Sequence, residues 1–278
     1  MSDTSVHGVV DRATDSKAFE YTARAGFAAS GVLHLLVAFI ILRLAFGSGG
    51  NADQSGALAT LAKQPGGTIM LWIAAAGLLA LGLWRVAEAI VGSKPSERPG
   101  QAQGQDQGQG DSSGWKRVKP LGLAIVNFAI AFSAMKFAMG GGQQSTQQNA
   151  GMSAQLMGSG WGKTLLIVVG LVVAVVGGYH VYKGAAKKFQ KDLQKYAGTA
   201  ITAVGVTGYV AKGLVLLGAG LLVIFATLTA DPSKATGLDA AVKTLGHAPF
   251  GKVLLILAAL GIAAFGAYSF VRSRHGRM

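Results

Sequence analysis

The sequence predicts an all-α polytopic membrane protein, with six transmembrane helices arranged as three tandem helical hairpins in a pseudo-threefold bundle. Two observations predict this fold class: the number of long apolar segments, and a unit that recurs three times. Of the 278 residues, 51% are hydrophobic and only 13% are charged, which is unusual for a soluble domain. A transmembrane helix needs about 20 mostly apolar residues. Six segments reach that length: 25–46, 68–91, 120–139, 163–182, 208–229 and 252–271.

A soluble protein with six buried helices is the alternative. A helix at the surface of a globular protein carries an apolar stripe opposite a polar face, whereas segments such as LLIVVGLVVAVVGG (165–178) are apolar on all sides. The first 20 residues contain no basic stretch followed by a short apolar core, so we expect no signal peptide. The absence of cysteine excludes disulfides, thiolate metal sites and cysteine nucleophiles.

Three copies of one unit appear when the second, fourth and sixth apolar segments are aligned without gaps. Each copy opens with glycine, has a second glycine fifteen positions later, then an aromatic residue, and ends on an ionisable residue. The second glycines are Gly82, Gly177 and Gly266. The aromatic residues are Trp84, Tyr179 and Tyr268, and the final residues are Glu88, Lys183 and Arg272. The segments that precede these copies match more loosely, through Gly31, Gly122 and Gly213.

The repeats divide the chain into five parts. Residues 1–19 are expected to be a disordered cytoplasmic tail, and 20–92, 115–198 and 199–278 are repeats 1, 2 and 3. Residues 93–114 are a flexible Gly/Gln-rich linker. Repeat 2 ends in a basic segment with apolar residues at helical spacing, which we expect to lie on the membrane surface as an amphipathic extension; these residues are Tyr182, Phe189, Leu193 and Tyr196. Between the spans of each repeat, a semi-apolar piece predicts a short helix at the outer interface, broken by Pro65 or Pro249 before the next span begins.

The basic residues predict the orientation. The amino-terminal flank, the connections between repeats, Lys212 and the carboxyl tail hold 18 of the 25 lysines and arginines. By the positive-inside rule, both termini are therefore expected in the cytoplasm of a cell (inner or plasma) membrane. The net charge of +13 is then explained by attraction to an anionic cytoplasmic leaflet, so we expect no nucleic-acid partner.

Ionisable and aromatic residues recur at the cytoplasmic end of the second helix of each repeat. Because Glu88 corresponds to Lys183 and Arg272, the shared property of this position is charge at a helix end. We interpret Arg85 with Glu88 as a helix end that reaches water, in preference to a catalytic or transport pair. Aromatic rings favour the headgroup level of a bilayer, which predicts an aromatic belt formed by Trp84, Tyr179 and Tyr268.

Two polar residues, His34 and Asn127, lie near mid-membrane depth in the first helices of repeats 1 and 2. Polar groups in lipid are expensive and are candidate functional residues by default. The simpler interpretation is an interhelical hydrogen bond, worth roughly 0.6 to 2 kcal/mol. In repeat 3, the aligned position is Leu216.

The sequence predicts no catalytic, cofactor or metal site. GSGWGKT (158–164) resembles a phosphate-binding loop, but the first glycine of that motif is replaced by Met157. His34 and His180 fall at different depths, which disfavours a haem held between them, and there is no HExxH motif or carboxylate cluster.

These residues resemble a known family. The openings ARAGFAASGV and TGYVAKGLV, a loop of about 36–40 residues, and an approximate PxGK…GxY pattern, repeated three times, are similar to the bacterial integral membrane family called domain of unknown function 1206. The resemblance covers about residues 20–275 and implies a six-span membrane protein without any assigned activity. Repeat 2 departs most, with Arg117 and Val118 in place of glycine followed by an aromatic residue.

Two classes of function fit these observations. The first is a non-enzymatic membrane component that scaffolds or modulates partner membrane proteins, and it is the one we favour. The second is permeation of a small solute or ion along the pseudo-threefold axis. An axis used for permeation predicts polar residues at mid-depth in all three repeats, and the sequence places them in two.

Overall fold

The computed structural model describes residues 17–91, 113–142, 145–193 and 198–276, and this part of the chain is helical without strands. Repeat 1 contains α2 (Lys17–Ala45), α3 (Gln54–Ala62) and α4 (Gly67–Val91). Repeat 2 contains α5 (Ser113–Ala138), α6 (Ser145–Met157), α7 (Gly160–Ala185) and the 3₁₀ turn η1 (Lys188–Asp192). Repeat 3 contains α8 (Thr199–Leu228), the 3₁₀ turn η2 (Pro232–Lys234), α9 (Leu238–Gly246) and α10 (Gly251–His275). The predicted tail lies almost wholly outside the described residues, as does the predicted linker.

Six of these helices are long and apolar enough to cross a membrane, and they coincide with the six predicted segments. In lipid, backbone polar groups must be satisfied within the segment, and a helix does this. The predicted short helices between spans are α3, α6 and α9. Local caps help to start two of the helices: Asp53 accepts a hydrogen bond from the Gly56 amide, and Ser159 accepts one from the Gly162 amide. The serine of GSGWGKT is thus a helix cap.

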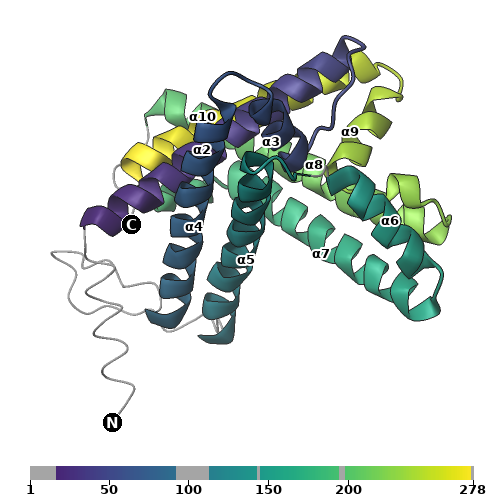
Figure 1. Cartoon of the computed structure of the whole chain (residues 1–278), viewed down its shortest axis with the longest axis horizontal. Helices are drawn as coiled ribbons and strands as arrows, with labels where there is room; N and C mark the ends of the chain where they lie inside the picture. Colours follow the sequence, from purple (N-terminus) through teal and green to yellow (C-terminus); the bar gives the residue numbers. More distant parts are fainter. Residues whose placement is uncertain (1–16, 92–112, 143–144, 194–197, 277–278) are drawn as a thin grey trace.

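The two ends of the molecule differ in character. We call one the basic end; it holds the first residues of α2, α5 and α8 and the last residues of α4, α7 and α10. We call the other the short-helix end, where α3, α6 and α9 lie. The start of α2 and the finish of α10 lie side by side (Figure 1), because Arg24 Nη1 donates to the Arg274 carbonyl at 2.8 Å. Both described termini are therefore at the basic end.

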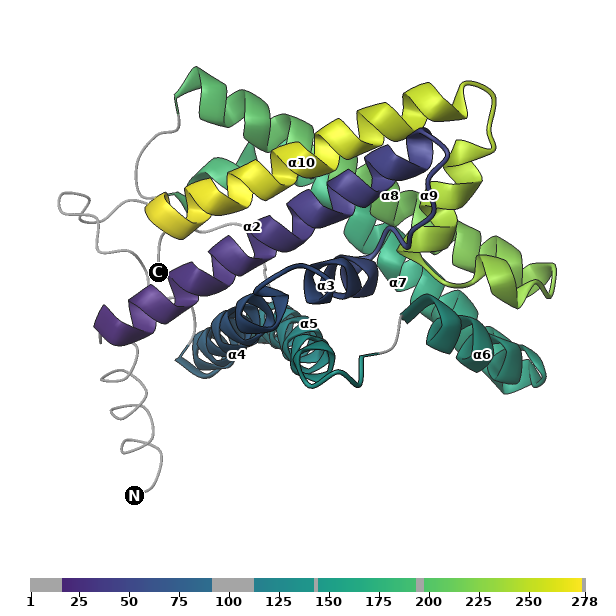
Figure 2. The ribbon, with the colours of Figure 1, turned by 45° about the horizontal axis from the view of Figure 1, so that its top comes forward.

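The closest helix pairs are formed between repeats. In Figures 1 and 2, α4 runs beside α5, α7 beside α8, and α10 beside α2. Each pair joins the second span of one repeat to the first span of the next, and the last pair returns to repeat 1. This cyclic order is what a pseudo-threefold arrangement of three hairpins requires.

The repeated glycines bring two of these pairs together, α7 with α8 and α10 with α2. A Cβ placed on Gly177 of α7 would lie 2.7 Å from the Gly213 carbonyl oxygen of α8. The equivalent Cβ on Gly266 of α10 would lie 3.0 Å from the Gly31 carbonyl oxygen of α2, which occupies the same place in its repeat. Small residues permit such close backbone approach in membranes. In these two pairs, the repeated glycines found in the sequence therefore set the packing register between repeats, whereas Gly82 of α4 faces the Phe128 ring of α5.

Within repeats 1 and 3, the two spans also cross closely. Gly26 of α2 meets the backbone of Gly77 of α4, and the corresponding Gly208 of α8 would bring a Cβ within 2.6 Å of the Phe265 backbone of α10. Gly261, which corresponds to Gly77, lies directly against the Ala211 methyl group. Both crossings thus depend on glycine in each helix.

Repeat 2 lacks this crossing, and α5 makes no extensive contact with α7. The sequence gives the reason. The place of Gly26 and Gly208 is taken by Arg117, and the place of Gly77 and Gly261 is taken by Val172. The sequence of repeat 2 therefore lacks the two glycines that permit close backbone approach in repeats 1 and 3. The bundle is therefore closed at repeats 1 and 3 and open at repeat 2.

Candidate functional site

A polar pair lies inside the bundle at mid-depth. His34 of α2 has its Nδ1 2.7 Å from the Ser30 carbonyl oxygen, and its Nε2 lies 3.2 Å from Lys212 Nζ of α8. A carbonyl oxygen can only accept, so Nδ1 carries the proton and Nε2 is left as the acceptor for the lysine. The pair connects repeat 1 to repeat 3.

Lys212 also lies over an aromatic ring. Its Nζ is 3.9 Å from the centre of the Phe265 ring of α10, and that ring lies 4.8 Å from the His34 ring. Ammonium groups are attracted to the faces of aromatic rings. Among the described residues, no carboxylate forms an ion pair with Lys212. A lysine in this position is expensive, and intramembrane ionisable groups mark functional sites by default.

The sequence predicts His34 as a polar residue at mid-depth, but it assigns Lys212 to the basic residues of the cytoplasmic side. The position of Lys212 in its helix could have indicated mid-membrane depth, because Lys212 is the fourteenth of the 30 residues of α8. Asn127 does not join this pair; its Nδ2 donates to the Leu123 carbonyl of its own helix at 2.8 Å. The structure therefore places a polar residue near mid-depth in each repeat and brings two of the three together.

The aromatic belt prediction is wrong for Tyr268. Its side chain is fully buried, and its hydroxyl donates to the Phe189 carbonyl at 3.1 Å. Phe189 is itself buried between the Tyr268 and Tyr209 rings, whose centres lie 5.2 and 5.4 Å from its own. Tyr179, by contrast, is 43% exposed, as a belt residue should be, and Trp84 is half-buried.

The burial of Phe189 also corrects the prediction for the segment after α7. That segment is not a helix on the membrane surface. It forms a 3₁₀ turn whose Phe189 and Leu193 insert between α7, α8 and α10, while Tyr182 stays exposed. The helical spacing correctly placed Phe189 and Leu193 on one apolar face, but this face packs against protein instead of lipid. Tyr196 lies outside the described residues.

The predicted helix-end charges converge at the basic end. Asp192 of the 3₁₀ turn pairs with Lys183 of α7 at 2.6 Å and reaches Arg272 of α10 at 4.0 Å. Arg272 and Arg85 both lie over the Phe27 ring of α2, at 4.4 and 5.9 Å from its centre. Lys183 and Arg272 thus stand at helix ends, as predicted, but turn toward protein partners. The side chain of Glu88 lies outside the described residues.

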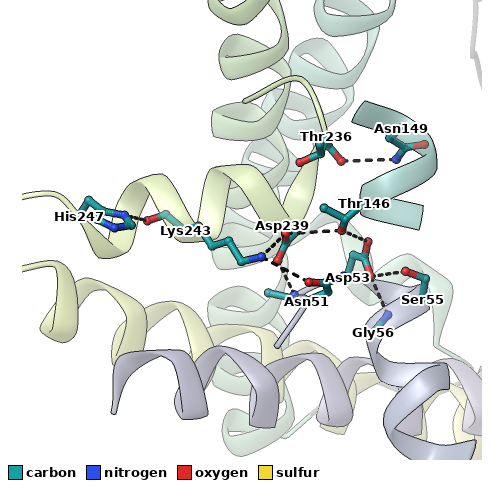
Figure 3. Close-up of polar contacts among 11 residues, drawn as sticks. Asn51, Asp53, Ser55, Gly56, Thr146, Asn149, Thr236, Asp239, Lys243 and His247 are labelled. Carbon is teal, nitrogen blue, oxygen red and sulfur yellow. Dashed lines mark hydrogen bonds and ion pairs between the residues drawn. The ribbon is translucent and has the colours of Figure 1, made fainter. Parts of the chain in front are cut away.

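A second polar cluster joins the three repeats at the short-helix end (Figure 3). Asp239, at the start of α9, accepts from the Ala52 amide at 2.8 Å and from Lys243 Nζ at 2.7 Å. Thr146, at the start of α6, has its hydroxyl 3.3 Å from an Asp53 oxygen and 3.5 Å from an Asp239 oxygen. Sequence reasoning missed this cluster because its residues are far apart in the chain and lie in connecting segments.

This cluster connects the starts of the short helices α3, α6 and α9, and we call it the lock. Asp53 and Asp239 are both buried, and each accepts hydrogen bonds from the backbone or side chains around it. Buried carboxylates need such partners. Within the described ranges, no group of three or more His, Asp or Glu side chains is placed to hold a metal ion.

A shallow cavity of about 290 Å³ lies at the short-helix end. Its lining comes from α3 and from the end of α5 and the loop that follows: Ala59, Ala62, Lys63, Phe137, Gly140 and Gly142. It is therefore separate from His34 and Lys212, which lie between α2, α8 and α10.

Comparison with known proteins agrees with the threefold repetition. The model of a family described as Domain of Unknown Function (DUF1206) matches residues 25–92, 118–187 and 207–276, which are the three repeats. The chain belongs to this family. It is also 28% identical over 260 residues to the uncharacterised protein YxxB of Bacillus subtilis (strain 168), covering 92% of this chain and 90% of that protein. No solved structure matches the chain significantly.

Proposed function

We propose that this DUF1206 protein is a non-enzymatic component of the cell membrane that scaffolds or modulates partner membrane proteins. One observation carries the proposal: the chain closes its bundle at repeats 1 and 3 but leaves the two spans of repeat 2 apart. The basic end faces the cytoplasm, because basic residues near span ends are retained on that side.

The interior of the bundle supports a packing role. In two of the close pairs glycine packs against backbone, as at Gly177 and Gly213, and this leaves no room between those helices for a solute. The cavity described above lies at the short-helix end and does not reach the polar pair at mid-depth.

The open spans offer apolar faces to a partner. α5 and α7 are the least buried of the six spans. Ile125 of α5 is 69% exposed, and Val172 of α7 is 56% exposed. In membranes, helices associate through packing and small residues, so a helix of another protein can cover faces that repeat 2 does not cover itself.

Site-directed crosslinking tests the proposal. The chain has no cysteine, so Ile125→Cys and Val172→Cys each introduce a single thiol at repeat 2. Leu221→Cys of α8 and Leu257→Cys of α10, which are 55% and 59% exposed, serve as controls on other spans. We expect one protein to crosslink in stoichiometric amount from repeat 2, at several times the yield of the controls. Equal crosslinking yields from all four positions would contradict the proposal.

A second function, permeation of a small ion, is favoured by the contact between Lys212 and His34. A half-buried ammonium beside an imidazole at mid-depth is a feature that packing alone does not require. Vesicles containing purified protein test it. Ion flux that is lost in both Lys212→Met and His34→Ala, and retained in Asn127→Ala, would support permeation. Vesicles that remain tight to small ions would exclude it.

A further inference from the structure

The turn after α7 is held rigidly at the basic end. We call residues 186–193 the lysine turn. Phe189 and Leu193 anchor it in the aromatic cluster, and the Tyr268 hydroxyl donates to the Phe189 carbonyl at 3.1 Å. Gln190 Nε2 donates to the Thr202 hydroxyl of α8 at 2.9 Å. The backbone of this turn is therefore fixed from inside by two apolar residues and two hydrogen bonds.

The acidic and basic side chains of the lysine turn point in different directions. Its acidic residue, Asp192, points inward and is paired with Lys183 and Arg272. The three lysines of the turn, Lys187, Lys188 and Lys191, are exposed. The turn consequently presents three positive charges outward, while its negative charge is neutralised by the protein.

Lys187 has an unusual backbone. Its φ of 53° places it in the left-handed region, where a residue other than glycine costs on the order of 1 kcal/mol. Glycine would relieve this strain, and glycine is abundant in this chain, with 41 residues. A lysine at this place gives up stability and gains a positive charge at the tip of the turn.

The neighbouring tyrosines place the turn at the headgroup level. Tyr179 and Tyr182 of α7 are 43% and 51% exposed, and amphipathic rings favour the membrane interface. Lys188 Nζ lies 4.5 Å from the centre of the Tyr182 ring. A hydrogen bond to Tyr182 raises the pKa of Lys188, so the lysine stays charged.

We propose that the lysine turn is a binding site for the phosphate of an anionic phospholipid in the leaflet at the basic end. The complementary charge comes from Lys187, Lys188 and Lys191, and the exposed Tyr182 ring packs against the lipid beneath its headgroup. This inference goes beyond the proposed function, because lipid binds at the turn whether the chain holds a partner or passes an ion.

Lipid binding to the full chain tests the site. The protein is purified in detergent, titrated with short-chain phosphatidylglycerol or phosphatidylcholine, and the bound lipid is counted by native mass spectrometry. We expect selective retention of phosphatidylglycerol. Each lysine of the turn changed to glutamine lowers that affinity about fivefold, so the triple Lys187→Gln, Lys188→Gln, Lys191→Gln variant loses selectivity.

Two control variants separate binding from folding and from charge in general. Lys187→Gly removes a charge and the backbone strain together, so its melting temperature stays equal or rises while its affinity for phosphatidylglycerol falls about fivefold. Lys163→Gln with Lys252→Gln removes exposed charges at the short-helix end and leaves the affinity unchanged.

Three results would overturn the inference. One is a triple variant that binds phosphatidylglycerol as the native chain does. Another is an equal loss of affinity in the control with Lys163 and Lys252 changed. The third is displacement of the lipid by inorganic phosphate at the same concentration, which would identify a free anion as the ligand in place of a lipid headgroup.

Discussion

Lys212 Nζ lies 3.2 Å from His34 Nε2, and this contact joins the third repeat to the first inside the bundle. The two residues are 178 positions apart in the chain. His34 aligns with Leu216 and Lys212 with Ser30, so neither ionisable residue recurs at the aligned place in the other repeat. The pair therefore breaks the threefold pattern at the point where the repeats meet.

Changing one member of this pair at a time should have unequal effects. His34→Ala leaves the Lys212 ammonium without its nitrogen acceptor, and we expect a loss of about 1 to 3 kcal/mol. Lys212→Met removes a half-buried charge and keeps an apolar side chain of similar length, so we expect a smaller loss or a gain. Thermal unfolding in detergent measures both. Asn127→Ala, which removes a hydrogen bond within one helix, is the control and should change stability by less than about 0.5 kcal/mol.

The lock at the short-helix end should depend on the charge of Asp239. Its side chain is 1% exposed and accepts hydrogen bonds from the Ala52 amide and Lys243. Asp239→Asn weakens these charged hydrogen bonds, and we expect a loss of about 2 to 3 kcal/mol in the free energy of unfolding. Asp231→Asn is a matched control, because Asp231 contacts Ser233 and Lys234 within its own turn and does not join one repeat to another. A similar loss in both variants would argue against the lock.

The sequence was sufficient to predict the spans, the three repeats and their recurring glycines, because each of these is a local or periodic property of the chain. It was not sufficient to predict which apolar residues face protein. Lipid and protein interior are both apolar, so hydrophobicity does not distinguish a belt position from a buried one, as Tyr268 illustrates. Phe189 and Lys212 were misplaced for a related reason: their partners come from other repeats, and alignment of the repeats does not reveal contacts between them.

The glycine crossing within repeat 3 should tolerate no side chain. Gly261→Val would push a branched side chain into the Ala211 methyl group, and we expect a loss of about 1 to 3 kcal/mol with separation of α8 from α10. Gly178→Val on α7 is the control, since no atom lies within 4 Å of the added Cβ. Thermal unfolding gives the stability, and a cysteine pair across α8 and α10 reports the separation. If Gly261→Val crosslinked and melted as the native chain does, the explanation for the open repeat 2 would fail.

The buried hydroxyl of Tyr268 provides the most direct test of the basic end. Tyr268→Phe keeps the ring among Phe189 and Tyr209 and removes only the hydrogen bond to the Phe189 carbonyl. That carbonyl then loses its donor inside an apolar cluster, so we expect a loss of about 0.5 to 1.5 kcal/mol in thermal unfolding. Tyr179→Phe, at the aligned and exposed position of repeat 2, should have no measurable effect. Because a belt tyrosine meets water through its hydroxyl, equal effects at the two positions would restore the aromatic belt interpretation of Tyr268.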